Sequence, residues 1–94
     1  MLIFTIFFNL LTIIDSLYLL ACLPAYNEEG VIGELIKKIT PLVDSVVVCD
    51  DGSTDLTSKE SQDAGAFVIQ HKQNKGKGAA LQSLFDFARH SNAD

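Results

Sequence analysis

Three short polar stretches hold the residues of this 94-residue chain that are best suited to chemistry. The stretch "DDGSTD" at 50–55 places two adjacent carboxylates, a glycine and small hydroxyl residues directly after a run of valines and a cysteine. The stretch "PAYNEE" at 24–29 combines a tyrosine with two glutamates, and "HKQNKGKG" at 71–78 places three lysines among glycines. Adjacent carboxylates at the end of a buried strand are compatible with several enzyme classes, but they could also cap a following helix. The lysines could serve one local anion or form an ordinary solvated loop.

Strand and helix patterns alternate along the rest of the chain. Apolar runs typical of strands buried on both faces occupy 16–23, 45–49 and 66–70. Helical patterns occupy 32–39, a segment that reaches Ala64 from Thr54 or Asp55, and 79–90. This alternation predicts an α/β domain of three layers, in which a parallel sheet in the order β-α-β-α-β-α carries helices on both faces. Ligands of such sheets bind beyond the carboxyl ends of the strands, so the three polar stretches should converge on one rim.

Capping residues and apolar spacing predict the limits and the buried faces of the helices. Asn27 is a natural N-cap for the first helix, which Pro41 should stop, and Gly65 should end the second helix. The residues expected to face the sheet are Ile32, Leu35, Ile36 and Ile39 in the first helix and Leu81, Leu84, Phe85 and Ala88 in the third.

Composition excludes some classes of partner. The formal net charge is −5, and a basic face is needed to neutralise phosphates, so nucleic acid is not expected as a partner. Cys22 and Cys49 lie in apolar strands without metal-ligand spacing, which indicates buried thiols in a reducing, cytoplasmic compartment. Residues 1–15 hold no charge before Asp15 and are shorter than the roughly 20 residues of a spanning helix. They are interpreted as an apolar extension or an anchor at the cytoplasmic face of a membrane, and the folded domain is expected to span 16–94.

Several common nucleotide and phosphoryl-transfer motifs do not fit the sequence. A P-loop aligned on Gly76 and Lys77 would have His71 in place of its first glycine. The first strand is followed by "PAYNEEG" rather than by the GxGxxG of a dinucleotide site. Gly52 stands where a DxDGT phosphatase needs its second acid, and the third strand ends in Gln70 rather than in the aspartate of a receiver domain. Among the nucleotide-dependent functions considered, nucleotide-sugar binding is the one that the sequence still fits.

The motifs "LPAYNEE", "VVVCDDGSTD" and "NKGKGAALQ", in this order and at these separations, resemble the N-terminal half of a family 2 glycosyltransferase with the GT-A fold. Over residues 17–94 the chain looks most similar to the branch that contains dolichyl-phosphate mannosyltransferases and related polyprenyl-phosphate sugar transferases. The resemblance implies the Rossmann-like, nucleotide-binding half of a GT-A domain. It also implies inverting transfer of a hexose from a GDP- or UDP-sugar to an acceptor, which in that branch is a polyprenyl or dolichyl phosphate at a membrane surface.

The resemblance further implies roles for residues at the first two strand ends. Pro24, Ala25 and Tyr26 would form the wall of the nucleoside pocket, and Glu28 would reach toward the base or the ribose. Asp51 would accept hydrogen bonds from the base, typically from a ring N–H.

Asp50 should have a different task from its neighbour, because successive strand side chains point to opposite faces. It is expected to support the turn through backbone N–H groups, and Gly52 would permit the sharp exit from the strand. The resemblance places a third group of residues along the nucleotide, where glycines allow close approach and lysines offset the charge of the diphosphate: Asn74, Lys75, Gly76, Lys77 and Gly78.

The metal motif of the family, an Asp-x-Asp sequence after the next strand, does not occur in this sequence. The resemblance therefore implies Mg²⁺ or Mn²⁺ for the complete enzyme, with the metal ligands and the catalytic base beyond Asp94. A chain truncated before its chemistry should be inactive alone and should leave its first strand as an unpaired apolar edge. The alternative is a non-catalytic nucleotide-binding or interaction module. His71 and His90 are expected on the surface rather than as ligands or bases.

Overall fold

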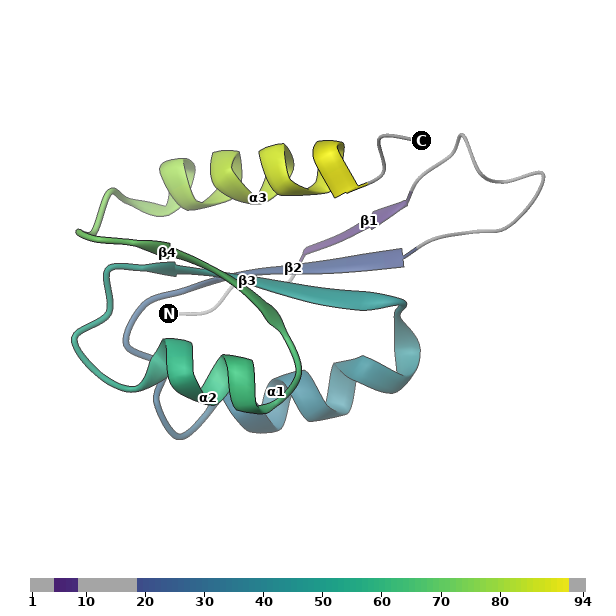
Figure 1. Cartoon of the computed structure of the whole chain (residues 1–94), viewed down its shortest axis with the longest axis horizontal. Helices are drawn as coiled ribbons and strands as arrows, with labels where there is room; N and C mark the ends of the chain where they lie inside the picture. The colour runs from purple at the N-terminus through teal and green to yellow at the C-terminus, as the bar shows by residue number, and fades with distance from the viewer. Residues whose placement is uncertain (1–4, 9–18, 92–94) are drawn as a thin grey trace.

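The computed structural model describes residues 5–8 and 19–91, in which strands and helices alternate as predicted (Figure 1). In chain order the elements are β1 (Thr5–Phe8), β2 (Leu19–Ala25), α1 (Ile32–Ile39), the 3-10 helix η2 (Thr40–Leu42), β3 (Ser45–Asp51), α2 (Thr57–Asp63), β4 (Phe67–His71) and α3 (Lys77–Ser91). Residues 16–18 of the first predicted strand, and the N-terminal segment apart from 5–8, lie outside the described residues. Among the helices of the described part, none is long and apolar enough to cross a membrane.

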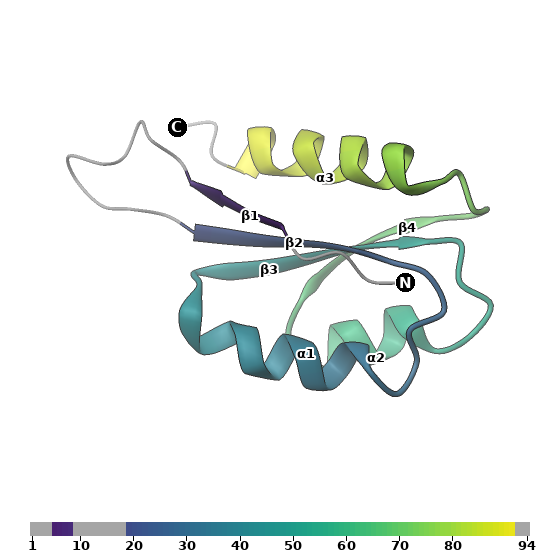
Figure 2. The ribbon, with the colours of Figure 1, turned by 180° about the vertical axis from the view of Figure 1, so that it is seen from behind.

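The strands form one sheet in the order β1-β2-β3-β4. β2, β3 and β4 are parallel, so that Leu23 is in register with Val48 and Val48 with Val68. α1 and α2 cover one face of this sheet and α3 covers the other (Figure 1, Figure 2). The predicted three-layer α/β arrangement is therefore confirmed. The predicted unpaired edge is wrong, because β1 runs antiparallel along β2, with Thr5 opposite Cys22.

Alternation of side chains along β3 divides the core into two parts. Val46 and Val48 face α1 and α2, whereas Val47 and Cys49 face α3. The first part contains Ala21, Leu23, Ala25, Ile32, Ile36, Ile39, Val46 and Val48. The second part contains Leu20, Cys22, Val47, Cys49, Ala80 and Leu84. The two residues that follow Cys49 continue the alternation, which places the two carboxylates on opposite faces of the sheet.

The ends of α1 and α2 agree with the sequence, but the starts of the helices do not. The N-cap position of α2 is Leu56 rather than Thr54 or Asp55, and α3 begins at Lys77 rather than at residue 79. The N-cap position of α1 is Val31 rather than Asn27. Asn27 adopts a φ of 52°, and its side-chain oxygen accepts a hydrogen bond from the N–H of Thr54 (2.9 Å), so it serves a different loop. The η2 turn that contains Pro41 follows α1, and α2 ends before Gly65, whose φ is 101°, as predicted.

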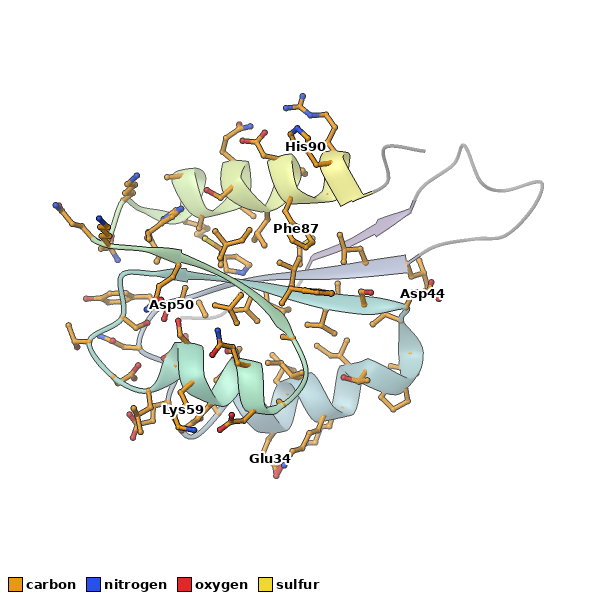
Figure 3. The ribbon with its side chains drawn as sticks, in the orientation of Figure 1. Glu34, Asp44, Asp50, Lys59, Phe87 and His90 are labelled. Carbon is orange, nitrogen blue, oxygen red and sulfur yellow. The ribbon has the colours of Figure 1, made fainter. Side chains whose placement is uncertain are left out.

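The face that α3 turns toward the sheet differs from the prediction at one position. Leu84 and Ala88 pack against the sheet as expected, but Phe85 is 46% exposed. Phe87 packs inward in its place, and Figure 3 shows its side chain pointing from α3 toward the sheet. The ring of Phe87 lies 5.8 Å from that of Phe67 on β4. The inward face of α3 thus runs through Ala80, Leu84 and Phe87, and Phe85 lies off this face.

Candidate functional site

A cavity of about 200 Å³ opens at the carboxyl ends of β2 and β3, beside the start of α3. Its lining residues are Pro24, Ala25, Tyr26, Asp51, Asn74, Gly76, Lys77 and Ala80. All of these except Ala80 were predicted as site residues from the sequence. The predicted residues that do not line the cavity are Glu28, Asp50, Gly52, Lys75 and Gly78. The three polar stretches thus converge on one rim of the sheet, as predicted.

Asp51 is the buried charge of this cavity, and two chain segments hold its carboxylate. Oδ1 accepts a hydrogen bond from the N–H of Lys75 (2.9 Å) and lies 2.8 Å from Nδ1 of His71. Oδ2 accepts a hydrogen bond from the N–H of Gly76 (2.9 Å). The other ring nitrogen of His71, Nε2, lies 2.8 Å from Oγ of Ser83 on α3. The contacts with Lys75, Gly76 and His71 fix the orientation of the Asp51 carboxylate and favour its ionised form.

Asp50 faces the opposite side of the sheet and does not line the cavity (Figure 3). Its side chain is 1% exposed, and Oδ1 accepts a hydrogen bond from the N–H of Ser53 (3.0 Å). Oδ2 accepts a hydrogen bond from the hydroxyl of Ser58 in α2. Asp50 therefore supports the turn after β3, as the alternation along the strand predicted.

Gly52 fixes the distance between this turn and the loop 73–76. Its φ is 80°, a left-handed conformation that favours glycine. A Cβ atom at this position would lie 2.4 Å from the backbone nitrogen of Asn74 and 2.5 Å from the carbonyl carbon of Gln73. The two backbones touch because no side chain separates them. Gly52 thus positions the loop that lines the cavity without lining the cavity itself.

The loop 27–30, which follows Tyr26, is joined to segment 53–60 by a set of hydrogen bonds that we call the inter-loop latch. Consecutive N–H groups of this loop donate to side chains of that segment: Asn27 to Ser53 (2.8 Å), Glu28 to Thr57 (2.8 Å), Glu29 to Asp55 (3.2 Å) and Gly30 to Glu60 (2.8 Å). In return the side chains of Asn27 and Glu29 accept hydrogen bonds from the N–H groups of Thr54 and Leu56, each at 2.9 Å. The wall that carries Tyr26 is therefore fixed to the turn after β3.

Comparison with known proteins assigns the chain to a family. The family model described as "Glycosyl transferase family 2" matches residues 21–91. The chain belongs to glycosyl transferase family 2. The matched residues run from β2 to α3, so the family 2 region contains every residue that lines the cavity. The family predicted from the sequence motifs is confirmed.

Characterised family 2 proteins resemble this chain over part of their length. Glucosyl-3-phosphoglycerate synthase of Mycobacterium tuberculosis is 43% identical over 70 residues, which covers 63% of this chain and 22% of the synthase. Its crystal structure superposes with a TM-score of 0.58 at 40% identity and covers 65% of this chain and 27% of that one. A second structure of the synthase, in complex with Mn²⁺, UDP and glucosyl-3-phosphoglycerate, has a TM-score of 0.55 at 40% identity and covers 62% of this chain and 25% of that one. These matches confirm the GT-A type of fold.

A further relative has dolichyl phosphate in its name. Dolichyl-phosphate beta-glucosyltransferase of Dictyostelium discoideum is 32% identical over 87 residues, which covers 73% of this chain and 27% of the relative. The synthase matches at higher identity, so placement in the dolichyl-phosphate mannosyltransferase branch is not supported. The chain spans about a quarter of the length of these relatives.

Two residues that support Asp51 in this family 2 chain were missed from the sequence. The expectation that His71 lies on the surface is wrong, because its side chain is 9% exposed and contacts Asp51. The predicted third strand ended at Gln70, whereas β4 continues to His71, which is in register with Asp51. That register would have indicated the contact. Ser83 gave no signal, because a helical serine is ordinary without a known partner.

The lysines of the family 2 loop differ in their position relative to the cavity. Lys77, the first residue of α3, lines the cavity, whereas Lys72 and Lys75 are exposed and do not. Lys75 contributes its backbone N–H to Asp51. Of the three lysines of this loop, Lys77 alone lines the cavity, and their role toward a diphosphate stays a prediction.

Both cysteines of the family 2 domain are buried free thiols, as their sequence context predicted. Burial raises the pKa of Cys22 to about 12. Burial, followed by the negative charges of Asp51 and Asp50, raises the pKa of Cys49 to about 12. Both thiols therefore remain protonated and act as small apolar side chains of the core.

The family's divalent metal has no site in the described part of this chain. No group of three or more His, Cys, Asp or Glu side chains is arranged there to hold a metal ion. Asp50 and Asp51 point to opposite faces of the sheet, so the adjacent carboxylates do not form a pair. The residues described here do not fit the metal, and we assign no chemical step to it.

The pKa of Asp51 predicts how the stability of this family 2 domain depends on pH. Burial raises that pKa, but hydrogen bonds from Lys75, His71 and Gly76 outweigh burial, so the pKa lies below its ordinary value. A carboxyl group whose pKa is lower in the folded state stabilises the fold above its unfolded pKa of about 3.9 and loses this effect as the pH falls through the folded value. The free energy of unfolding should therefore decrease as the pH falls below about 4.

The Asp51→Asn variant should show a shallower decrease, measured by urea unfolding followed by circular dichroism between pH 5 and the lowest pH at which the fold persists. Asp63→Asn is the control, because the exposed ion pair of Asp63 with Lys59 contributes little. Equal slopes in the wild type and Asp51→Asn would count against the assignment.

Proposed function

We propose that this chain is the donor-nucleotide-binding part of a glycosyltransferase that transfers a hexose from a UDP-sugar to an acceptor. One observation carries the proposal: the buried, ionised Asp51 faces a small cavity at the carboxyl edge of a family 2 domain. UDP accompanies Mn²⁺ in the structure of the related synthase, which favours uracil over guanine as the base.

The size and lining of the cavity suit a nucleoside better than a complete nucleotide sugar. Its volume of about 200 Å³ is below the roughly 300–1,000 Å³ of typical ligand pockets, so it holds only part of the donor. Pro24, Ala25 and Ala80 supply apolar surface, and the 39%-exposed ring of Tyr26 offers a face for stacking. Asp51 would accept the ring N–H of the base, and Glu28 would lie toward the ribose.

The start of α3 supplies the features that a diphosphate needs. Gly76 and Lys77 line the cavity at the N-terminus of a 15-residue helix, where unsatisfied N–H groups favour an anion. Lys75 and Lys77 would offset the charge of the diphosphate, and Gly78 would allow its close approach. Together with Asn74, these residues would follow the nucleotide away from the base.

The acceptor in this proposal carries a phosphate group. The names of the relatives include phosphoglycerate and dolichyl phosphate, and both acceptors share this group. Residues 16–94 carry the donor-binding half in this proposal, with β1 paired to the edge of their sheet, and a lipid-phosphate acceptor would place the N-terminal segment close to a membrane surface. Mg²⁺ or Mn²⁺ would serve the enzyme through ligands outside the residues that the structure describes.

A second candidate function is a non-catalytic nucleotide-binding module. It is favoured by the lack of a metal-binding group among residues 5–8 and 19–91. Both candidates require nucleotide binding, and they differ in whether a sugar is transferred.

The 94-residue chain should bind UDP with a dissociation constant of about 0.1–1 mM, because the cavity encloses only part of the nucleotide. Isothermal titration calorimetry with UDP and GDP, each with and without Mn²⁺, measures this affinity. Mn²⁺ should change it little, and UDP-glucose should not be turned over. If neither nucleotide binds, the proposed function is wrong, whereas turnover by the isolated chain would exclude the non-catalytic module.

A further inference from the structure

His71 lies between Asp51, whose carboxylate lines the cavity, and Ser83 of α3. It ends β4 in register with Asp51, which ends β3, so the two side chains project from neighbouring strand ends. Nδ1 of His71 lies 2.8 Å from Oδ1 of Asp51, and Nε2 lies 2.8 Å from Oγ of Ser83. The side chains of His71 and Asp51 are 9% and 6% exposed, so water competes little for these contacts.

The carboxylate of Asp51 fixes the direction of its hydrogen bond with His71. An ionised carboxylate can only accept, so Nδ1 of His71 carries the proton and donates to Asp51. In the neutral ring Nε2 is then an acceptor, and it receives the hydroxyl proton of Ser83. The carboxylate therefore sets the proton on Nδ1, and the hydroxyl of Ser83 holds the other side of the ring. The Sγ atom of Cys49 lies 3.6 Å from the same Nε2, and its protonated thiol is compatible with this tautomer.

The hydrogen bonds of Asp51 leave room for one more donor. A carboxylate offers about four acceptor positions. Within the described structure Oδ1 receives two donors, from His71 and Lys75, and Oδ2 receives one, from Gly76. About one position on Oδ2 therefore remains for a group that enters the cavity. One ring N–H of a base matches this single position, whereas a metal ion would need several oxygen ligands.

We infer that His71, supported by Ser83, is a positioning residue that turns Asp51 so that one oxygen accepts a single N–H from the base. This inference rests on the proposed function, because it concerns recognition of the nucleotide in the same cavity. His71 itself does not line the cavity and acts through Asp51. Ser83 does not line it either, so its hydroxyl is a support for the ring and not a nucleophile.

A pair of nucleotides that differ in one hydrogen bond tests the inference. 3-Methyl-UDP lacks the ring N–H of UDP but keeps the ribose and the diphosphate. The wild type should prefer UDP over 3-methyl-UDP by about 10- to 100-fold, as measured by calorimetry. If the wild type binds GDP instead, GDP and 1-methyl-GDP form the corresponding pair.

Substitutions of His71 should change this preference rather than affinity alone. His71→Leu replaces the ring with an apolar side chain that has no hydrogen-bond donor. The preference for UDP over 3-methyl-UDP should then fall to about threefold or less. His71→Asn places an amide N–H near the former Nδ1, so most of the preference should return. Ser83→Ala should give an intermediate preference. His90→Leu is the matched control, because His90 is exposed on α3 and points away from the sheet (Figure 3), and its preference should equal that of the wild type.

The outcomes separate this inference from the proposed function. If the wild type binds neither UDP nor GDP, the proposed function fails and the inference fails with it. If the wild type prefers UDP but His71→Leu and His71→Asn show equal preferences, high or low, the inference is wrong and the proposed function stands. Circular dichroism and thermal unfolding establish that each variant is folded. Should His71→Leu not fold, the Ser83→Ala and His71→Asn variants decide, since an unchanged preference in Ser83→Ala together with a lost preference in His71→Asn would overturn the inference.

Discussion

Replacing Gly52 with alanine should abolish UDP binding and lower the free energy of unfolding by about 2–4 kcal/mol. The new Cβ would lie 2.4 Å from the backbone nitrogen of Asn74, which cannot move aside as the end of a flexible side chain could. The loop 73–76 must then shift, and the hydrogen bonds from the N–H groups of Lys75 and Gly76 to Asp51 would be lost. Calorimetry with UDP and urea unfolding measure the two effects.

Gly65→Ala provides a matched control for this steric explanation. Gly65 also has a positive φ, of 101°, but a Cβ atom at this position meets nothing within 4 Å. Its substitution should cost about 1 kcal/mol through backbone strain alone, and UDP binding should remain. Equal losses of stability in the two variants would show that backbone conformation, rather than contact with the loop, decides the effect at Gly52.

Replacing Asp51 with asparagine should weaken UDP binding by about 10- to 100-fold. The amide group has one oxygen acceptor in place of two, and its NH₂ group would face the N–H donors of Lys75 or Gly76. The free energy of unfolding should fall by about 1–3 kcal/mol, because one buried donor loses its partner. Calorimetry and urea unfolding again separate the effect on affinity from the effect on stability.

The neighbouring carboxylate gives the comparison that makes this prediction specific. Asp50→Asn alters a side chain that is equally buried but faces α2. It should cost similar stability, while UDP affinity should change by less than about threefold. A loss of UDP affinity in Asp50→Asn as large as in Asp51→Asn would mean that the two carboxylates act together, contrary to their placement on opposite faces of the sheet.

The order of elements and the rim of the sheet were predictable because local patterns decide them. The apolar run before Pro24 and the valines before Asp50 could only be buried strands, and parallel strands bring their carboxyl ends to one edge. The opposite tasks of Asp50 and Asp51 followed from the alternation of side chains along a strand. These features depend on neighbours in the sequence, which is why the sequence alone revealed them.

The remaining features depend on contacts between residues far apart in the chain. His71 appeared to be a surface residue because the sequence does not state that it lies in register with Asp51. Asn27 has the composition of an N-cap, but Thr54 competes for its side chain and draws it into another loop. Phe85 and Phe87 both fit a helical face, and packing of Ala80 and Leu84 against the sheet turns Phe87 inward. Pairing of β1 with β2 was likewise hidden in a segment whose apolar character suggested a membrane.

The inter-loop latch determines when the chain loses the conformational entropy of its binding wall. The four amides from Asn27 to Gly30 are bonded to side chains of the same domain, so this loop becomes ordered as the domain folds. Ordering of a loop at the moment of association would otherwise oppose binding. In the proposed function, a nucleotide that contacts Tyr26 would meet a wall whose backbone is already ordered. The loss of entropy on association would then come mainly from the ligand and from exposed side chains.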